Sequence, residues 1–136
     1  MVKIEGIIKL LTAAAAALAA RLFGGIDAAL GILLCFITFD YITGILSAIV
    51  QKELSSEIGY RGILKKAGIL VIVAVAYLIG LYIGFEVRSW VIGYYIANES
   101  LSILENLGRV GVPYPERLVE VLKQLKKESD SDESIS

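Results

Sequence analysis

The chain has 136 residues, of which 57% are hydrophobic, and its mean hydropathy is +0.73. Soluble domains contain about 45–50% apolar residues, and a short chain has little interior in which to bury long apolar runs. The net charge of −1 gives no indication of a nucleic-acid partner. Histidine is absent and Cys35 is the only cysteine, which argues against a histidine base, a metal site and an intrachain disulfide.

The first candidate helix covers about residues 4-23 and contains the alanine run Ala13–Ala17. It is only weakly hydrophobic and has basic residues near both ends. Three interpretations stay open: it spans the membrane, lies in the interface, or is a signal peptide cleaved at the small-x-small sequence Ala17-Leu18-Ala19. An uncleaved helix is favoured because the segment that follows is itself apolar enough to span.

Three further candidate spans follow. Residues 28-50 are long enough to cross a hydrocarbon core of about 30 Å, and they carry Asp40 near their middle. Residues 67-85 contain no charge. Residues 89-107 are mixed, with aromatic side chains at the start and amides, hydroxyls and carboxylates further on. The sequence therefore predicts an all-α integral membrane protein with three or four transmembrane helices, with four favoured.

The C-terminal part is polar. Pro113 and Pro115 break the preceding helix. Residues 116-127 predict a short amphipathic helix whose apolar face holds Leu118, Val121, Leu122 and Leu125. Residues 128-136 are serine, aspartate and glutamate with a single isoleucine, and they predict a disordered acidic tail. The membrane domain is thus expected to cover residues 1-127.

Basic residues predict the orientation. The connection between the second and third spans holds four of them, and such an excess in a short loop marks the cytoplasmic side: Lys52, Arg61, Lys65 and Lys66. The region after the fourth span is also rich in lysine and arginine. We therefore expect both this connection and the C-terminus to be cytoplasmic.

Polar side chains recur at helical spacing inside two of the candidate spans. A carboxylate near the bilayer centre costs about 2.5–3.5 kcal/mol, so these faces should contact another helix or water. For both stripes, one interpretation is a pore-lining or oligomer-forming face. The alternative for the second segment is contacts within one subunit. The alternative for the fourth segment is that the helix lies in the membrane interface with its polar face toward the headgroups. The residues are Asp40, Thr43, Gly44 and Ser47 in the second segment, and Asn98, Glu99, Ser102, Glu105 and Asn106 in the fourth.

Small residues at four-residue spacing let helix backbones approach closely. They occur in the third and fourth spans, at Ala76, Gly80, Gly84, Gly93 and Ala97. The pattern predicts helix packing, either between subunits or within one.

The order of several short motifs carries a resemblance to a known family. The chain reads Asp40-Tyr41-Ile42-Thr43-Gly44, and later Asn98-Glu99 followed by Ser102-Ile103-Leu104-Glu105-Asn106 and by Gly111-Val112-Pro113. With these motifs the chain resembles the phage holin family, which includes clostridial toxin-secretion holins. The resemblance extends over about residues 33–127.

The resemblance implies a function. Holins oligomerise in the bacterial inner (cytoplasmic) membrane and open timed lesions that release a cell-wall hydrolase (endolysin) or a toxin. The implied partners are further copies of the chain and membrane lipids, with no stable binding of the cargo, no cofactor and no catalysis. A small ion channel and a small multidrug-type transporter are the alternatives.

Overall fold

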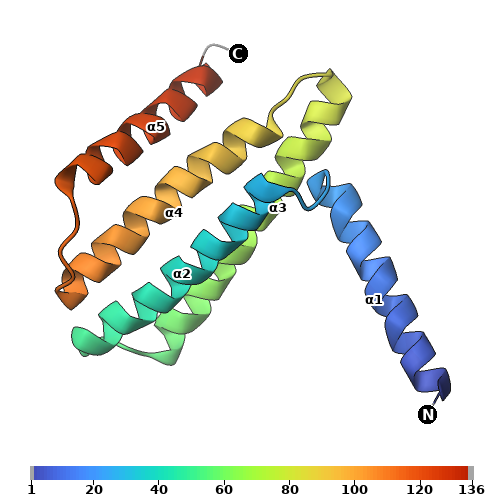
Figure 1. The fold of residues 1–136 in the computed structure, drawn as a ribbon, viewed down its shortest axis with the longest axis horizontal. Helices are drawn as coiled ribbons and strands as arrows, with labels where there is room; N and C mark the ends of the chain where they lie inside the picture. Colours follow the sequence, from blue (N-terminus) through green and yellow to red (C-terminus); the bar gives the residue numbers. More distant parts are fainter. Residues whose placement is uncertain (1, 135–136) are drawn as a thin grey trace.

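The computed structural model describes residues 2–134, and within this range all regular secondary structure is α-helical (Figure 1). This confirms the predicted all-α class and is consistent with a protein that crosses a membrane several times. The five helices are α1 (Val2–Phe23), α2 (Ala28–Val50), α3 (Ser56–Ile83), α4 (Arg88–Val110) and α5 (Glu116–Ser134).

Two helices begin at side-chain caps. The carboxylate of Asp27 accepts a hydrogen bond from the Leu30 N–H at 3.0 Å, so α2 begins at the predicted residue. The Ser55 hydroxyl accepts one from the Ile58 N–H at 3.2 Å, which lets α3 begin at Ser56 rather than at residue 67. The predicted connection between residues 50 and 67 was therefore wrong in its extent: it covers only residues 51–55, and three of the four basic residues assigned to it lie inside α3, at Arg61, Lys65 and Lys66.

The C-terminal helix is longer than expected. We predicted a disordered tail from residue 128, but α5 continues to Ser134. No proline or glycine follows Pro115 to end the helix, and the Gln124 side-chain amide donates to the Glu128 carboxylate at 3.2 Å, one turn on. The last two residues of the predicted tail lie outside the described residues.

The helices are arranged around α4. It packs along α2, contacts α3 on another side, and is covered by α5 (Figure 1). Helix α1 packs against α3, meets α4 through its last residue, Phe23, and otherwise diverges from the other helices. By length and composition, α1, α2 and α3 are apolar enough to cross a membrane. The doubtful span is thus α4 rather than α1, because α4 carries most of the polar residues noted above.

The interior formed by α2, α3 and α4 changes character along its length. One half is an apolar core, made of Leu30, Leu33, Ile37, Ile69, Val73, Ala76, Val91 and Ile92. The other half contains buried polar side chains, namely Asp40, Thr43, Ser47, Glu99 and Asn106. We call these the apolar half and the polar half of the bundle.

Candidate functional site

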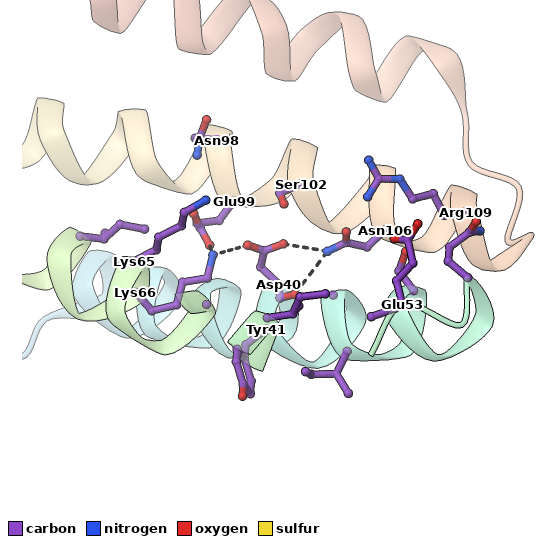
Figure 2. A pocket seen from close by; sticks show the side chains of 18 residues that line it. Asp40, Tyr41, Glu53, Lys65, Lys66, Asn98, Glu99, Ser102, Asn106 and Arg109 are labelled. Carbon is purple, nitrogen blue, oxygen red and sulfur yellow. Dashed lines mark hydrogen bonds and ion pairs between the residues drawn. The ribbon is translucent and has the colours of Figure 1, made fainter. Parts of the chain in front are cut away.

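The polar half is centred on one lysine. The Lys66 ammonium forms ion pairs with both the Asp40 and the Glu99 carboxylates (Figure 2). The three side chains come from α3, α2 and α4, and they are 17%, 9% and 2% exposed. A single positive charge therefore holds together three helices through groups that are almost removed from solvent.

Asn106 extends this cluster along α4. Its amide donates to Asp40 Oδ1 at 2.9 Å and to the Thr43 hydroxyl at 3.1 Å, and it approaches the Asp40 carbonyl at 3.3 Å. The Thr43 hydroxyl in turn donates to the Phe39 carbonyl at 2.8 Å. Throughout the described part of the chain, no buried side-chain nitrogen or oxygen lacks a hydrogen-bond partner. The polar half is thus internally satisfied within one subunit.

A cavity of about 860 Å³ adjoins the cluster (Figure 2). It lies between α2, α3 and α4, and extends from the Lys66 cluster toward the bundle end that contains residues 51–55. Polar side chains supply much of its wall, including Ser47, Gln51, Glu53, Ser102 and Arg109. Polar walls and this volume suit water, whereas the apolar half offers water no comparable polar lining.

The charge of the cluster is unbalanced. Two carboxylates face one ammonium, and a buried ion pair is stable only when each charge keeps its partners. Separating α3 from α2 and α4 would leave three unpaired charges, which water can solvate and hydrocarbon cannot. The arrangement can therefore be closed in a subunit or open to water, but it is not compatible with exposure to lipid. Among residues 2–134, no cluster of three or more His, Cys, Asp or Glu side chains could hold a metal ion.

A second ionic contact closes the opposite end of the bundle. Arg88, at the first residue of α4, forms a bidentate ion pair with Asp27 at 2.8 and 2.9 Å. It also donates to the carbonyls of Phe23 and Gly25, at the end of α1. The Arg88 guanidinium holds the pKa of the Asp27 carboxyl well below its usual range, first through these hydrogen bonds. This Arg88 clamp joins α1, α2 and α4 beside the apolar half.

The two predicted polar stripes meet in the structure, although not as two simple faces. Asp40, Thr43 and Asn106 form the cluster with Glu99, while Gly44, Ser47 and Ser102 line the cavity. Asn98 instead accepts a hydrogen bond from Lys126 of α5 at 2.8 Å, although it also borders the cavity. Glu105 is exposed and pairs with Arg109 one turn away.

The predicted packing residues have different environments. Ala76 and Ala97 are buried between helices. A Cβ atom at Gly80 would lie 2.7 Å from the Phe85 carbonyl. The absence of a side chain at Gly80 therefore lets the chain that follows α3 turn back closely against the helix. Gly84 ends α3 with a φ of 70°, and Gly93 has no atom within 4 Å of where a Cβ would stand. Within one subunit, only the two alanines serve helix packing.

The sequence did not predict the ion pairs of Lys66 or the contacts of the Arg88 clamp. Lys66 was assigned to a loop because the start of α3 was placed too late, although Ser55-Ser56-Glu57 carries the composition of a helix N-terminus. Asp27 directly precedes an apolar run and is likewise a capping signal. Neither signal identifies the distant partner, because pairing between helices depends on their packing.

A family model described as the bacteriophage holin family matches residues 17–127. This range includes α2, α3, α4, the cluster and the cavity. No solved structure matches the chain significantly.

Several curated proteins are similar over most of their length. An uncharacterized protein of Listeria monocytogenes is 44% identical over 114 residues, covering 82% of this chain and 81% of the relative. An uncharacterized 14.9 kDa protein of Clostridium perfringens is 45% identical over 107 residues, covering 76% and 81%. A protein of Bacillus phage phi105 named a probable holin is 34% identical over 113 residues, covering 82% and 83%.

Proposed function

Because the chain belongs to the bacteriophage holin family, we propose that it is a holin of the bacterial cytoplasmic membrane. In this proposal copies of the chain accumulate, oligomerise and, at a timed moment, form lesions that release a cell-wall hydrolase or a toxin. The partners are other copies and membrane lipids, and the cargo passes without stable binding. No catalysis is involved.

The observation that carries the proposal is the closed ionic cluster of Asp40, Lys66 and Glu99 beside a polar cavity. In one subunit these groups pair with one another. This pairing offsets the cost of burying their charges and stabilises a dormant state inside the membrane. When subunits assemble, the same groups can exchange internal partners for water. A set of such subunits then presents polar walls to a shared lumen and apolar walls to lipid.

The direction of opening follows from the two halves of the bundle. The apolar half has a continuous core and the Arg88 clamp beside it, whereas the polar half already contains a cavity. We propose that α3 separates from α2 and α4 first in the polar half. The apolar half then acts as the fixed end of this movement.

The proposed orientation places residues 51–55 and the C-terminus in the cytoplasm. Lys52, Arg61 and Lys65 support it, because they lie toward that end of α2 and α3. A Ser56→Cys variant in a Cys35→Ala background tests it. An impermeant thiol reagent added to intact cells should leave this cysteine unlabelled, and labelling from outside contradicts the orientation.

The function is tested by inducible expression in a bacterium, with and without a cytoplasmic cell-wall hydrolase that has no secretion signal. Turbidity and membrane potential are followed together. Abrupt depolarisation after a reproducible delay, with lysis only when the hydrolase is present, is the expected result. Depolarisation that never releases the hydrolase would instead favour a narrow ion channel, the second candidate that the polar cavity supports. No depolarisation at all contradicts both.

A further inference from the structure

The helix α5 lies along α4, and this contact uses only one side of α5 (Figure 1). Lys126 donates to the Asn98 side-chain oxygen at 2.8 Å and lies 5.6 Å from the centre of the Tyr94 ring. Val119 and Leu122 are half-buried on the same side as Lys126, at positions i, i+3 and i+7. These three residues are the α4-facing stripe of α5.

The docked position of α5 conflicts with a bilayer around α4. Since α4 packs along α2 from the Arg88 clamp onward, an α4 that crosses the membrane with α2 carries the docked α5 to the same depth. The side of α5 away from α4 exposes charged groups such as Glu120 and Lys123. Hydrocarbon does not accept these groups, so α5 must border water or leave α4.

A second apolar stripe on α5 offers a different contact. Leu118, Val121 and Leu125 are 43%, 49% and 49% exposed, and they again follow the i, i+3, i+7 spacing. Val112 and Tyr114, in the connection just before α5, are also exposed. Residues 116–127, which hold this stripe, contain four basic and two acidic side chains, whereas the other four acidic residues of α5 follow the stripe, at 128–134. An exposed apolar stripe on the basic part of a helix is the composition of a segment that lies in a membrane interface.

The connection before α5 permits a change of direction. Gly111 has a φ of 102°, a left-handed conformation that ends α4, and Pro113 and Pro115 prevent the helix from continuing. Residues 111–115 are therefore a non-helical connection, about which α5 can change its direction relative to α4. Because they follow directly on α4, they keep α5 within reach of the bilayer surface at which α4 ends.

We propose that α5 has a second docking surface, the anionic phospholipid surface at which residues 111–115 emerge. When α4 enters the bilayer, α5 leaves α4 and lies in the interface through Leu118, Val121 and Leu125. The inference rests on the proposed orientation, which requires α4 to cross the bilayer because residues 51–55 and the C-terminus lie on the same side, but it does not rest on lesion formation. Release of α5 also uncovers Tyr94 and Asn98 on α4.

The test uses the full chain in vesicles, before any lesion forms. Single cysteines replace Val121 or, as a matched control on the polar side of the same helix, Glu120, both in a Cys35→Ala background. Each is labelled with an environment-sensitive fluorophore and exposed to brominated lipid as a quencher. We expect several-fold stronger quenching at Val121 than at Glu120 in vesicles containing phosphatidylglycerol, and a smaller difference in phosphatidylcholine alone.

A cross-link separates the two positions of α5. Cysteines at Asn98 and Lys126 should be joined in detergent by a bifunctional thiol reagent that spans the length of the Lys126 side chain, and closing this cross-link before reconstitution should abolish quenching at Val121. A Val121 label that is no more quenched than the Glu120 label in either lipid overturns the proposal. A label at the exposed Gly93 reports separately whether α4 is in the bilayer, so failure of the proposed function is distinguished from failure of this inference.

Discussion

The apolar half and the polar half of the α2–α4 bundle hold the same three helices together through different interactions. The apolar half is sealed by side chains such as Leu33 and Val73, which are fully buried. The polar half is held by ion pairs and hydrogen bonds to Lys66 and Asn106, and it leaves a cavity of about 860 Å³. Apolar contacts hold in lipid only through close packing, whereas polar contacts can be replaced by water. The comparison locates the part of the molecule that can open.

The largest effect is expected from Lys66→Met. It leaves two carboxylates facing one another without their counter-charge, and removing one partner of a buried pair costs about 3–5 kcal/mol. We expect a corresponding loss in the free energy of unfolding, measured by denaturant titration in detergent micelles. The triple variant Lys66→Met, Asp40→Asn, Glu99→Gln removes all three charges and should recover much of the loss. Equal loss in the single and triple variants contradicts the role of the ion pairs.

A smaller effect is expected at the Arg88 clamp. Arg88→Met removes hydrogen bonds to Asp27 and two carbonyls, but the Asp27 side chain is 51% exposed and regains water. We expect a loss of about 2 kcal/mol, with Ser89→Ala, an exposed position of the same turn, as the control variant.

The pH dependence of this loss identifies the group responsible. The pKa of Asp27 is lowered in the folded protein, so the clamp's contribution is fully present above the ordinary carboxylate pKa of about 4 and is lost as the pH falls further. The difference between wild type and Arg88→Met should therefore stay constant from pH 7 to pH 5. It should shrink only below about pH 4. A difference that shrinks near neutral pH would assign the effect to another group.

The polar half should set the time of opening. Asp40→Asn keeps an acceptor for Asn106 but reduces the cluster to one carboxylate and one ammonium, which weakens the hold of α2 on α3. We expect the delay between induction and depolarisation to change, while the amount of protein in the membrane does not. Thr38→Val, an exposed position of the same helix, serves as the control. An unaltered delay at equal protein level would show that Asp40 does not contribute to timing.

The last comparison concerns two glycines, one in a crowded and one in an open position. Gly80→Ala places a Cβ atom against the Phe85 carbonyl and should destabilise the subunit by about 1–3 kcal/mol. Gly93→Ala meets nothing within 4 Å, so it should not destabilise the subunit, and the higher helix propensity of alanine should stabilise it by up to about 1 kcal/mol. If Gly93→Ala nevertheless alters chemical cross-linking between copies, Gly93 lies at a contact between subunits. Identical behaviour of the two variants would contradict the assigned roles.

Local signals were enough to predict much of the fold. Apolar runs and Pro113 defined the helical order, and α2 begins and ends where its hydropathy does. The start of α3 was missed because its first turns are polar, and a polar helix extension has the same composition as a loop. The length of α5 was missed for the same reason.

The candidate site was only half predictable. Asp40, Glu99 and Asn106 were recognisable because polar side chains are rare in apolar helices. Their partner Lys66 was not, because its distance from them along the chain carries no information on which helices meet. The separation of Asn98 and Glu105 from the cluster likewise depends on the rotation of α4 against α2, which periodicity alone does not fix.

The most direct test of the account is the accessibility of the cavity wall before and after triggering. A Ser102→Cys variant in the Cys35→Ala background is expressed in cells and treated with an impermeant thiol reagent from outside. The account predicts no labelling while the membrane is polarised, and rapid labelling once depolarisation begins, because the polar half then lines a water-filled lumen. A cysteine that is labelled equally at both times, or that stays protected after depolarisation, would contradict the claim that this half of the bundle opens.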